Sequence, residues 1–522
     1  MDLKIPVVFS EELLENYREL WQVAFSYWEL DILPRSNDLV RAQGCLRKDL
    51  PDEGLGFECI RRHIMQDIIP GFNGGSISPN YYGFVTGGVT PAALFADNVV
   101  SAYDQNVQVH IPGHSIATEV EDATLGLLTD LFRLDRQTWK NGTFTTGATA
   151  SNILGLACGR EFVLRAAAEK QGNHIASVGE HGIFEVLQAA GLSGLQILST
   201  MPHSSITKAA GILGFGRGHV KSVSQEKNSL QFDINLLERE ISRKDRASIV
   251  VISCGEVNTG HFATAGIQQL QQLRKLCDQY GSWLHVDGAF GIFGRILDED
   301  VSEFASITRG CEGLDLADSI TGDAHKLLNV PYDCGFFLCR HKNLAESVFQ
   351  NPNAAYLSSG GIDDSTIPSP LNIGVENSRR FRALPVYASL VSYGRKGYQD
   401  ILQRQILLAR MIAGWIFDHP CYMALPLTGT KAELLEKTFI IVLFRAKDEG
   451  LNRQLGTKIN ATSKIFVSGT TWQGEPACRI AISNWRVDEN RDFTLLTKVL
   501  DHISDGNNQG GSAFNNHIFC MN

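Results

Sequence analysis

Residues 319–335 read SITGDAHKLLNVPYDCG and place one lysine, Lys326, between an apolar stretch and a turn. The residues before it are short-chained or apolar, as is typical of a buried β-strand. A lysine condenses with an aldehyde only in its neutral form, which a desolvated environment favours. Most lysines are solvated surface residues, but the apolar and small neighbours of Lys326 favour a reactive amine.

The strand pattern extends outward on both sides of Lys326. Short apolar runs occur at 195–200 (LQILST), 247–253 (ASIVVIS), 283–287 (WLHVD) and 335–339 (GFFLC), with helical stretches between them. Such runs, separated by helices, are typical of βαβ units and a mainly parallel sheet. We therefore predict an α/β fold with functional groups at the carboxyl ends of its strands.

Three other segments place polar or flexible residues after such strands. Asp287 ends the run WLHVD, where a carboxylate can reach a ligand or can simply cap the following turn. The segment TFTTGATASNILGLACGRE (143–161) joins a turn to a small-residue helix, so Thr149, Ser151 and free N–H groups could bind a phosphate. An ordinary capped helix is the alternative. His203 opens a helix after LQILST and could stack on a flat cofactor or serve a structural role.

Composition and charge are those of an ordinary globular protein. Of the 522 residues, 43% are hydrophobic and 20% charged, which argues against a disordered regulator. The net charge of −10 does not suit nucleic acid as the main partner. Residues 1–10 lack a secretory signal, and no apolar run is long enough to cross a membrane, so we expect a cytoplasmic protein. The 11 cysteines have no zinc-ligand spacing, and we expect no metal site.

Changes of pattern divide the chain into five parts. Residues 11–31 have apolar residues at helical spacing, and 351–380 are rich in Pro, Gly and Ser. Strand-like runs at 437–445 and 463–484 follow a helical stretch at 385–418, which indicates a smaller α+β domain. The expected parts are an N-terminal helical segment (1–80, with a connector at 32–56), a large α/β domain (81–350), a mobile loop region (351–380), a small C-terminal domain (381–505) and a disordered tail (506–522).

The order of these segments, a glycine-rich turn, a histidine, a strand-end aspartate and a His-Lys pair, resembles the group II pyridoxal phosphate (PLP)-dependent decarboxylases. This family includes the aromatic amino acid, glutamate and histidine decarboxylases. The similarity is carried by PNYYGFVTGGVTPAALFAD (79–97), HVDGAFG (285–291) and TGDAHKLLNVPYDCG (321–335), and covers most of residues 55–505. It implies PLP fold type I: a large domain with a seven-stranded, mostly parallel sheet, a small α+β domain, and a homodimer with active sites at its interface.

The resemblance also implies roles for individual residues. Lys326 would hold PLP as a Schiff base, His203 would stack on its ring, and Asp287 would pair with its pyridine nitrogen. That carboxylate keeps the nitrogen protonated, so that the ring withdraws electrons from the substrate. The expected catalytic residues are Lys326, His203 and Asp287; the cofactor-binding residues are these three with Ala148, Thr149, Asn258, Ala289 and His325; the substrate residues are Tyr82, Phe84, Thr86 and Arg379.

The substrate residues have structural alternatives. Aromatic residues such as Tyr82 are equally typical of a protein core. Arg379 could bind a carboxylate with its guanidinium fork or pair with an acid of the large domain. The family pattern Gly-Thr-Thr is replaced here by Gly-Glu-Val at 255–257, so a hydroxyl contact is lost or is replaced by Asn258.

A second departure concerns the mobile loop. Many members use a loop tyrosine to protonate the carbon that loses its carboxylate, and residues 358–378 contain no tyrosine. Tyr356, just before this loop, and His203 are alternative proton donors. Members without the tyrosine can form an aldehyde, ammonia and peroxide.

We therefore expect decarboxylation of an L-amino acid, with an aromatic or apolar side chain, to the amine and carbon dioxide. The first alternative is decarboxylation linked to oxidative deamination, or another diversion of the same chemistry. The second is a non-catalytic homologue. The presence of Lys326, Asp287 and His203 together argues against a protein that only binds.

Overall fold

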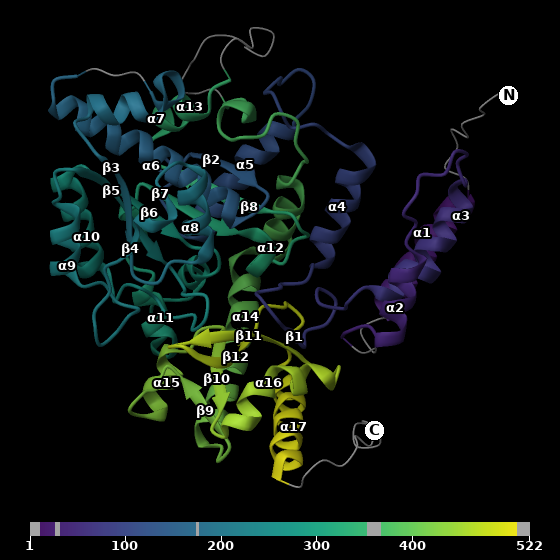
Figure 1. Ribbon diagram of the computed structural model, residues 1–522. Coiled ribbons are helices and arrows are strands. Elements are labelled where there is room, and N and C mark those ends of the chain that lie inside the picture. Colours follow the sequence, from purple (N-terminus) through teal and green to yellow (C-terminus); the bar gives the residue numbers. More distant parts are fainter. Residues whose placement is uncertain (1–10, 27–31, 174–176, 352–366, 509–522) are drawn as a thin grey trace.

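The computed structural model describes residues 11–26, 32–173, 177–351 and 367–508. A seven-stranded sheet forms the centre of the large domain (Figure 1). Its order is β2-β8-β7-β6-β5-β3-β4, and β8 alone of these seven runs antiparallel to its neighbours, which confirms the mostly parallel sheet. The strands are β2 (Asn141–Thr145), β3 (Gly194–Ser199), β4 (Val220–Ser222), β5 (Arg246–Ser253), β6 (Trp283–Asp287), β7 (Ser319–Asp323) and β8 (Gly335–Cys339).

Helices cover both faces of this sheet, which explains why its strands are apolar throughout. On β5, Ile249 and Val251 face one hydrophobic core, while Val250 and Ile252 face the other. The first core includes residues of α6 (Ala148–Lys170), α7 (Val178–Ala189), α8 (Ser204–Ile212) and α13 (Lys342–Phe349). The second includes residues of α4 (Pro91–Tyr103), α5 (Ala117–Leu131), α9 (Ile234–Ile241), α10 (Ile267–Tyr280), α11 (Ala305–Gly310) and α14 (Ala383–Asp418).

Two glycines let α6 lie directly on the sheet. A Cβ atom at Gly155 would come within 2.5 Å of the His285 ring, and one at Gly159 within 2.8 Å of Trp283. Any larger residue would push the helix away from β6. The small-residue helix expected after the 143–147 turn is therefore held close to the strand that ends in Asp287.

A second sheet forms the small domain, in the order β1-β11-β12-β10-β9. Neighbouring strands are antiparallel except that β1, from the N-terminal part of the chain, runs parallel to β11. The strand predicted at 437–445 begins later in the structure, at Ile441, because Lys437 still belongs to α15 (Lys431–Lys437). The elements are β1 (Tyr81–Tyr82), β9 (Tyr422–Leu425), β10 (Ile441–Ala446), β11 (Phe466–Trp472), β12 (Glu475–Ala481), α15, α16 (Glu449–Ala461) and α17 (Glu489–Asn508).

Helix α14 connects the two domains. Its first half, including Leu390 and Ile401, belongs to the core of the large domain, and its second half, including Leu408 and Ile416, to the core of the small one. The helix is kinked at Gly394, where φ is 58°. One long helix therefore fixes how the two domains face each other (Figure 1).

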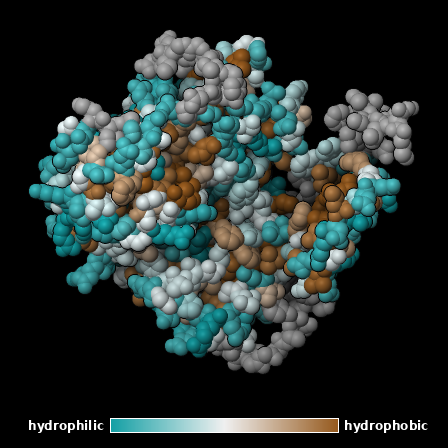
Figure 2. Space-filling model, turned by 45° about the horizontal axis from the view of Figure 1, so that its top comes forward, coloured by the Kyte–Doolittle hydropathy of each residue, from teal (hydrophilic) through white to brown (hydrophobic). Residues whose placement is uncertain are grey.

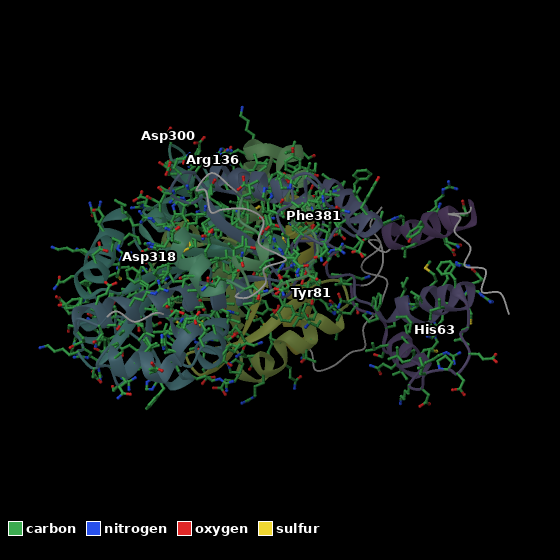
Figure 3. The ribbon with its side chains drawn as sticks, turned by 90° about the horizontal axis from the view of Figure 1, so that it is seen from above. His63, Tyr81, Arg136, Asp300, Asp318 and Phe381 are labelled. Atoms are coloured by element: carbon green, nitrogen blue, oxygen red, sulfur yellow. The ribbon has the colours of Figure 1, made fainter. Side chains whose placement is uncertain are left out.

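The N-terminal helices form an arm that stands away from the body (Figures 1 and 3, where His63 lies on the arm). They are α1 (Glu11–Ser26), α2 (Ser36–Cys45) and α3 (Phe57–His63), and α2 lies where the sequence predicted only a connector. In α2 only Ala42 is buried, so the helix lacks the apolar stripe that would have predicted it.

Some expectations lie outside the described residues. These include Tyr356, residues 352–366 of the expected loop, and the tail after Asn508. Among the described residues, no helix is long and apolar enough to cross a membrane. The cytoplasmic location stays a prediction.

Candidate active site

Strands β2, β6 and β7 end at one edge of the large sheet, where they bring the expected Asp287 together with Asp323, which the sequence analysis did not select. Asp287 is the last residue of β6 and Asp323 the last residue of β7. In the register of the sheet, Gly335 of β8 pairs with both Asp323 and Thr145, the last residue of β2. The turn after β2 therefore starts beside Asp323.

These groups line one cavity of about 430 Å³. It is bounded by the turn after β2, the ends of β5, β6 and β7, and part of the small domain. Eight of the residues expected at the site line it, namely Phe84, Ala148, Thr149, His203, Asp287, Ala289, His325 and Lys326. Residues separated by more than 240 positions in the sequence thus meet in one place.

Lys326 lies on the short helix α12 (Ala324–Leu327), one turn after the end of β7. Its Nζ lies 2.8 Å from Oδ2 of Asp323 and 5.8 Å from the ring centroid of Phe290. The apolar surroundings expected from the sequence are therefore only part of its environment. The amine must leave this contact with Asp323 before it can react with an aldehyde.

Asp287 is held by hydrogen bonds and is only 6% exposed. Its Oδ2 accepts from the amide of Asn152 (3.1 Å) and its Oδ1 from the backbone N–H of Ala289 (3.3 Å). The Asn152 amide also donates to Oγ of Ser205 (3.0 Å), which lies 2.8 Å from Nδ1 of His203. The carboxylate and the imidazole are thus positioned by one shared network.

A buried histidine, His285, is hydrogen-bonded to this network. His285 lies 2.9 Å from Oδ1 of Asn152 through Nε2 and 2.7 Å from Oγ of Ser319 through Nδ1. Burial lowers the pKa of His285 to about 3. The neutral ring can donate to the Asn152 oxygen and accept from Ser319, which orients the amide that holds Asp287.

The N-terminus of α6 forms the other end of the cavity. The backbone N–H of Ala148 donates to Oδ1 of Asp323 (2.5 Å), and Nε2 of His325 lies 3.5 Å from the same oxygen. At Gly147 (φ 157°) a Cβ atom would lie 3.3 Å from the His325 ring. Burial lowers the pKa of His325, with Asp323 opposing the shift. A helix start with a bound carboxylate is an anion site.

Arg479 of β12 is a site residue that the sequence reasoning missed. It lines the cavity and is 7% exposed; one guanidinium nitrogen donates to the backbone oxygen of Phe84, while its Nε has no partner among the described residues. Burial lowers its pKa to about 10, partly opposed by Glu256, so it remains charged at neutral pH. A basic residue inside the apolar run ACRIAIS (477–483) was the signal available in the sequence.

Four expected residues do not line the cavity. Tyr82 is fully buried in the core of the small domain, and its hydroxyl donates to Asn80. Thr86 is buried and donates to the backbone of Gly83.

Asn258 faces β11 and accepts a hydrogen bond from Thr470 (2.7 Å), while its neighbours Gly255 and Val257 line the cavity instead. The turn therefore contributes to the site through residues other than the one expected.

Arg379 also lies outside the cavity. It pairs with an acid of the large domain, which was the structural alternative to binding a substrate carboxylate. Its guanidinium is buried against Glu121, and it donates to the backbone oxygens of Val107 (2.9 Å) and Phe144 (3.1 Å) and to Oγ1 of Thr143 (3.2 Å). With these partners its guanidinium is engaged within the large domain, which favours the structural alternative over a contact with the substrate.

Comparison with known proteins agrees with this geometry. Residues 41–423 match the model of the pyridoxal-dependent decarboxylase conserved domain. The chain belongs to this family. Its members are carboxy-lyases, and their cofactor, PLP, is the cofactor of this chain.

Relatives of this pyridoxal-dependent decarboxylase carry different names. It is 28% identical over 382 residues to an L-2,4-diaminobutyrate decarboxylase of Acinetobacter baumannii, covering 70% of each chain. It is 24% identical to a tryptophan decarboxylase of Camptotheca acuminata (88% and 86% covered) and 22% identical to a phenylacetaldehyde synthase of a Rosa hybrid cultivar (88% and 86%). The substrate therefore does not follow from the family.

Solved structures share the fold. Oryza sativa TDC with PLP and tryptamine superposes with a TM-score of 0.78 at 19% identity, covering 96% of this chain and 99% of that one. Rhodiola rosea 4-hydroxyphenylacetaldehyde synthase gives 0.75 at 19% identity (97% and 99%).

The cavity fits PLP by its own chemistry. It combines an amine at Lys326, a carboxylate at Asp287 and a helix start at Ala148, and Gly147 keeps the turn free of a Cβ atom that would lie 3.3 Å from the His325 ring. These are an attachment point, a partner for a ring nitrogen and a phosphate site.

Proposed function

We propose that this decarboxylase converts an L-amino acid with an aromatic or apolar side chain to the corresponding amine and carbon dioxide. The observation that carries the proposal is the meeting of Lys326, Asp287, His203 and the α6 N-terminus in one cavity. Bound there, PLP supplies an electron sink for the bond to the departing carboxylate.

The residues of the cavity have separate tasks. Lys326 would hold the cofactor, and Asp287, fixed by Asn152, would keep the pyridine nitrogen protonated. His203 would cover one face of the ring, with its Nδ1 engaged by Ser205 and its Nε2 left to face the reacting carbon. Burial lowers the pKa of His203, with Asp287 opposing the shift. The N–H groups of Ala148 and Thr149 would bind the phosphate.

Arg479 supports a substrate with one carboxylate. Its guanidinium would bind that group and so orient the bond that breaks. The surrounding side chains of Phe84, Val85, Val257 and Phe290 are apolar and would accept an aromatic or branched side chain.

A second candidate product is an aldehyde. The absence of tyrosine from residues 358–378 favours it, and relatives named phenylacetaldehyde synthase and 4-hydroxyphenylacetaldehyde synthase show the same product class in their names. In that reaction oxygen accepts the electrons left by the carboxylate, and aldehyde, ammonia and peroxide are released with carbon dioxide.

We also propose that the enzyme is a homodimer joined through the N-terminal arm. Exposed apolar side chains gather on α2 and α3, among them Val40 (67% exposed) and Phe57 (59%), and Figure 2 shows this apolar surface in brown. A groove of about 920 Å³ lies between the arm and α4, lined by Trp21 and Phe95. A second copy would cover both surfaces.

The test is product analysis of the PLP-loaded enzyme with a panel of L-amino acids, following carbon dioxide, amine and peroxide together. Amine equal to carbon dioxide without peroxide supports the first candidate and names the substrate. Peroxide and aldehyde equal to carbon dioxide support the second. No turnover of any aromatic or apolar amino acid would overturn the proposed substrate class.

A further inference from the structure

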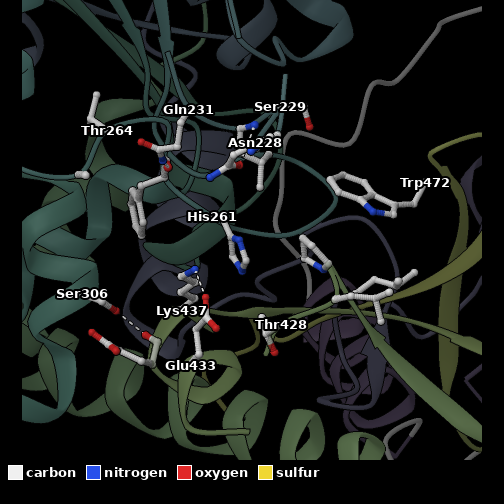
Figure 4. A pocket seen from close by; sticks show the side chains of 18 of the residues that line it. Asn228, Ser229, Gln231, His261, Thr264, Ser306, Thr428, Glu433, Lys437 and Trp472 are labelled. Carbon is white, nitrogen blue, oxygen red and sulfur yellow. Dashed lines mark hydrogen bonds and ion pairs between the residues drawn. The ribbon is translucent and has the colours of Figure 1, made fainter. Parts of the chain in front are cut away.

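A second cavity, of about 820 Å³, lies between the two domains and apart from the cofactor (Figure 4). Asn228, His261 and Ser306 line it from the large domain, and Thr428 and Trp472 from the small one. Among the described residues, none that lines this cavity also lines the cofactor cavity. It is therefore a separate candidate binding site.

Most charges in this second cavity are already paired. Lys437 lies 2.7 Å from Glu433, and Arg309 lies 3.2 Å from Glu436. Arg445 of β10 also lines the cavity and is half-buried, and its side chain has no hydrogen-bond or ion-pair partner among the described residues. Glu226 and Lys227 line the cavity as exposed residues of opposite charge. The half-buried guanidinium of Arg445 is thus left to attract an anion, and its planar fork suits a carboxylate.

The cavity also contains a neutral imidazole. Figure 4 shows the ring of His261 directed into the centre of the lining residues, near Lys437. Burial, together with the charge of Lys437, lowers the pKa of His261 to about 4. The neutral ring can donate one hydrogen bond and accept another, and it has no partner among the described residues.

Part of the lining is apolar. It is formed by Phe262 and Leu425, by the edge of the buried Trp472, and by Leu427, which is 72% exposed. An aromatic or branched ligand would cover Leu427 and displace water from this wall. Inorganic anions gain nothing from such a surface.

We propose that the cavity between the domains is a second small-molecule site, which binds an organic monocarboxylate with an apolar body. Arg445 holds the carboxylate, His261 binds a polar group beside it, and the wall around Leu427 covers the apolar part. Lysine and arginine side chains outnumber glutamates in the lining by four to three, so one carboxylate balances the charge of the site. This assignment is independent of the amino acid that the enzyme decarboxylates.

The experiment is calorimetric titration of the PLP-loaded enzyme with phenylacetate, which has no amino group and cannot react with PLP. Saturable binding is expected, and it should weaken by at least about tenfold in Arg445→Gln, because one charge-assisted contact is lost. Leu427→Asp, an exposed change that adds a negative charge to the wall, should weaken it as well. Thermal unfolding of both variants checks that they remain folded.

Three controls locate the ligand. Arg479→Gln should leave phenylacetate affinity unchanged, because Arg479 lines only the cofactor cavity. The neutral analogue 2-phenylethanol and inorganic phosphate should both bind more weakly than phenylacetate. The proposal is overturned if no binding occurs at millimolar phenylacetate, if Arg445→Gln and Leu427→Asp bind as wild type, if binding is lost in Arg479→Gln, or if phosphate binds better.

Discussion

At the scale of single residues, the amine of Lys326 decides whether the cofactor is attached. Replacing Lys326 by alanine removes the only expected attachment point, so the visible absorption band of lysine-bound PLP should disappear. Circular dichroism should stay unchanged, because the side chain is 21% exposed and, within the described part of the chain, pairs only with Asp323. Lys208→Ala, an exposed lysine, should keep the band. A band that survives in Lys326→Ala, or borohydride labelling at another lysine, would refute the assignment.

Arg479 is proposed to orient the substrate through its carboxylate. In Arg479→Gln, kcat/KM should fall by roughly tenfold to a hundredfold, mainly through KM, because a charge-assisted contact to the substrate is lost. The affinity for PLP, measured by titration of its absorbance, should hardly change. Arg479→Lys should recover part of the loss, since it keeps the charge but not the planar fork. Wild-type kinetics in Arg479→Gln would exclude the role.

His285, which orients the amide that holds Asp287, makes the stability of the folded enzyme depend on pH. Its pKa is lowered to about 3 in the folded enzyme, against an ordinary value of 6.5. Between these values the unfolded chain binds a proton that the folded one does not, so this residue lowers stability as pH falls below about 6.5. In His285→Gln, which keeps a donor toward Asn152, the decline should be shallower by up to ~1.4 kcal/mol per pH unit.

Urea unfolding at several pH values between about 4.5 and 7 measures this difference. His114→Gln, at an exposed position, should show the wild-type slope. Equal slopes in His285→Gln and wild type would mean that the buried ring is not kept neutral by the fold.

At the scale of elements, the turn after β5 shows why the Gly-Glu-Val departure is tolerated. The carboxylate of Glu256 points inward and accepts from the backbone N–H groups of Asn258 (3.0 Å) and Thr259 (2.9 Å) and from the Thr259 hydroxyl (2.9 Å). These hydrogen bonds hold residues 256–259 together as a turn. Gly255 and Val257, the neighbours of Glu256, are thereby held against the cofactor cavity.

Removing this carboxylate should loosen the turn. Glu256→Ala leaves several buried donors without a partner, at a cost of roughly 1–3 kcal/mol each at most. The thermal midpoint and the affinity for PLP should both fall. Glu53→Ala, at an exposed glutamate, should change neither. Unchanged PLP affinity in a destabilised Glu256→Ala would show that the turn serves stability alone.

The sequence predicted those parts of the site that depend on neighbours along the chain. Asp287 and Lys326 each follow a recognisable buried strand, and strand ends of a parallel sheet meet at one edge. The two arginines required contacts that no local pattern contains. Arg379 is buried against Glu121, 258 positions away, and Arg479 reaches the cavity only because β12 pairs beside β11 in the small domain.

At the scale of the whole molecule, the arm formed by α1, α2 and α3 is the feature that one chain does not explain. Phe57, Ile60 and Ile64 lie at helical spacing on one face of α3 and the turn that follows it, and they are 59%, 40% and 43% exposed. An apolar face of this kind is stable in water only when another surface covers it. No part of the described body does so, because the arm stands away from it (Figure 3).

A second copy of the chain is proposed to bind this apolar face, and negative charges introduced there should prevent dimerisation. The double change Phe57→Asp and Ile64→Asp should shift the enzyme from dimer to monomer in sedimentation velocity, since two carboxylates would be buried without partners at the interface. Arg62→Asp, 60% exposed at its side chain and on the same helix, is the matched control and should remain dimeric. A dimer that survives the double change would move the interface away from the arm, and a monomeric wild type would remove the interface altogether. If dissociation also abolishes activity while PLP stays bound, the second copy completes the active site and does more than cover an apolar surface.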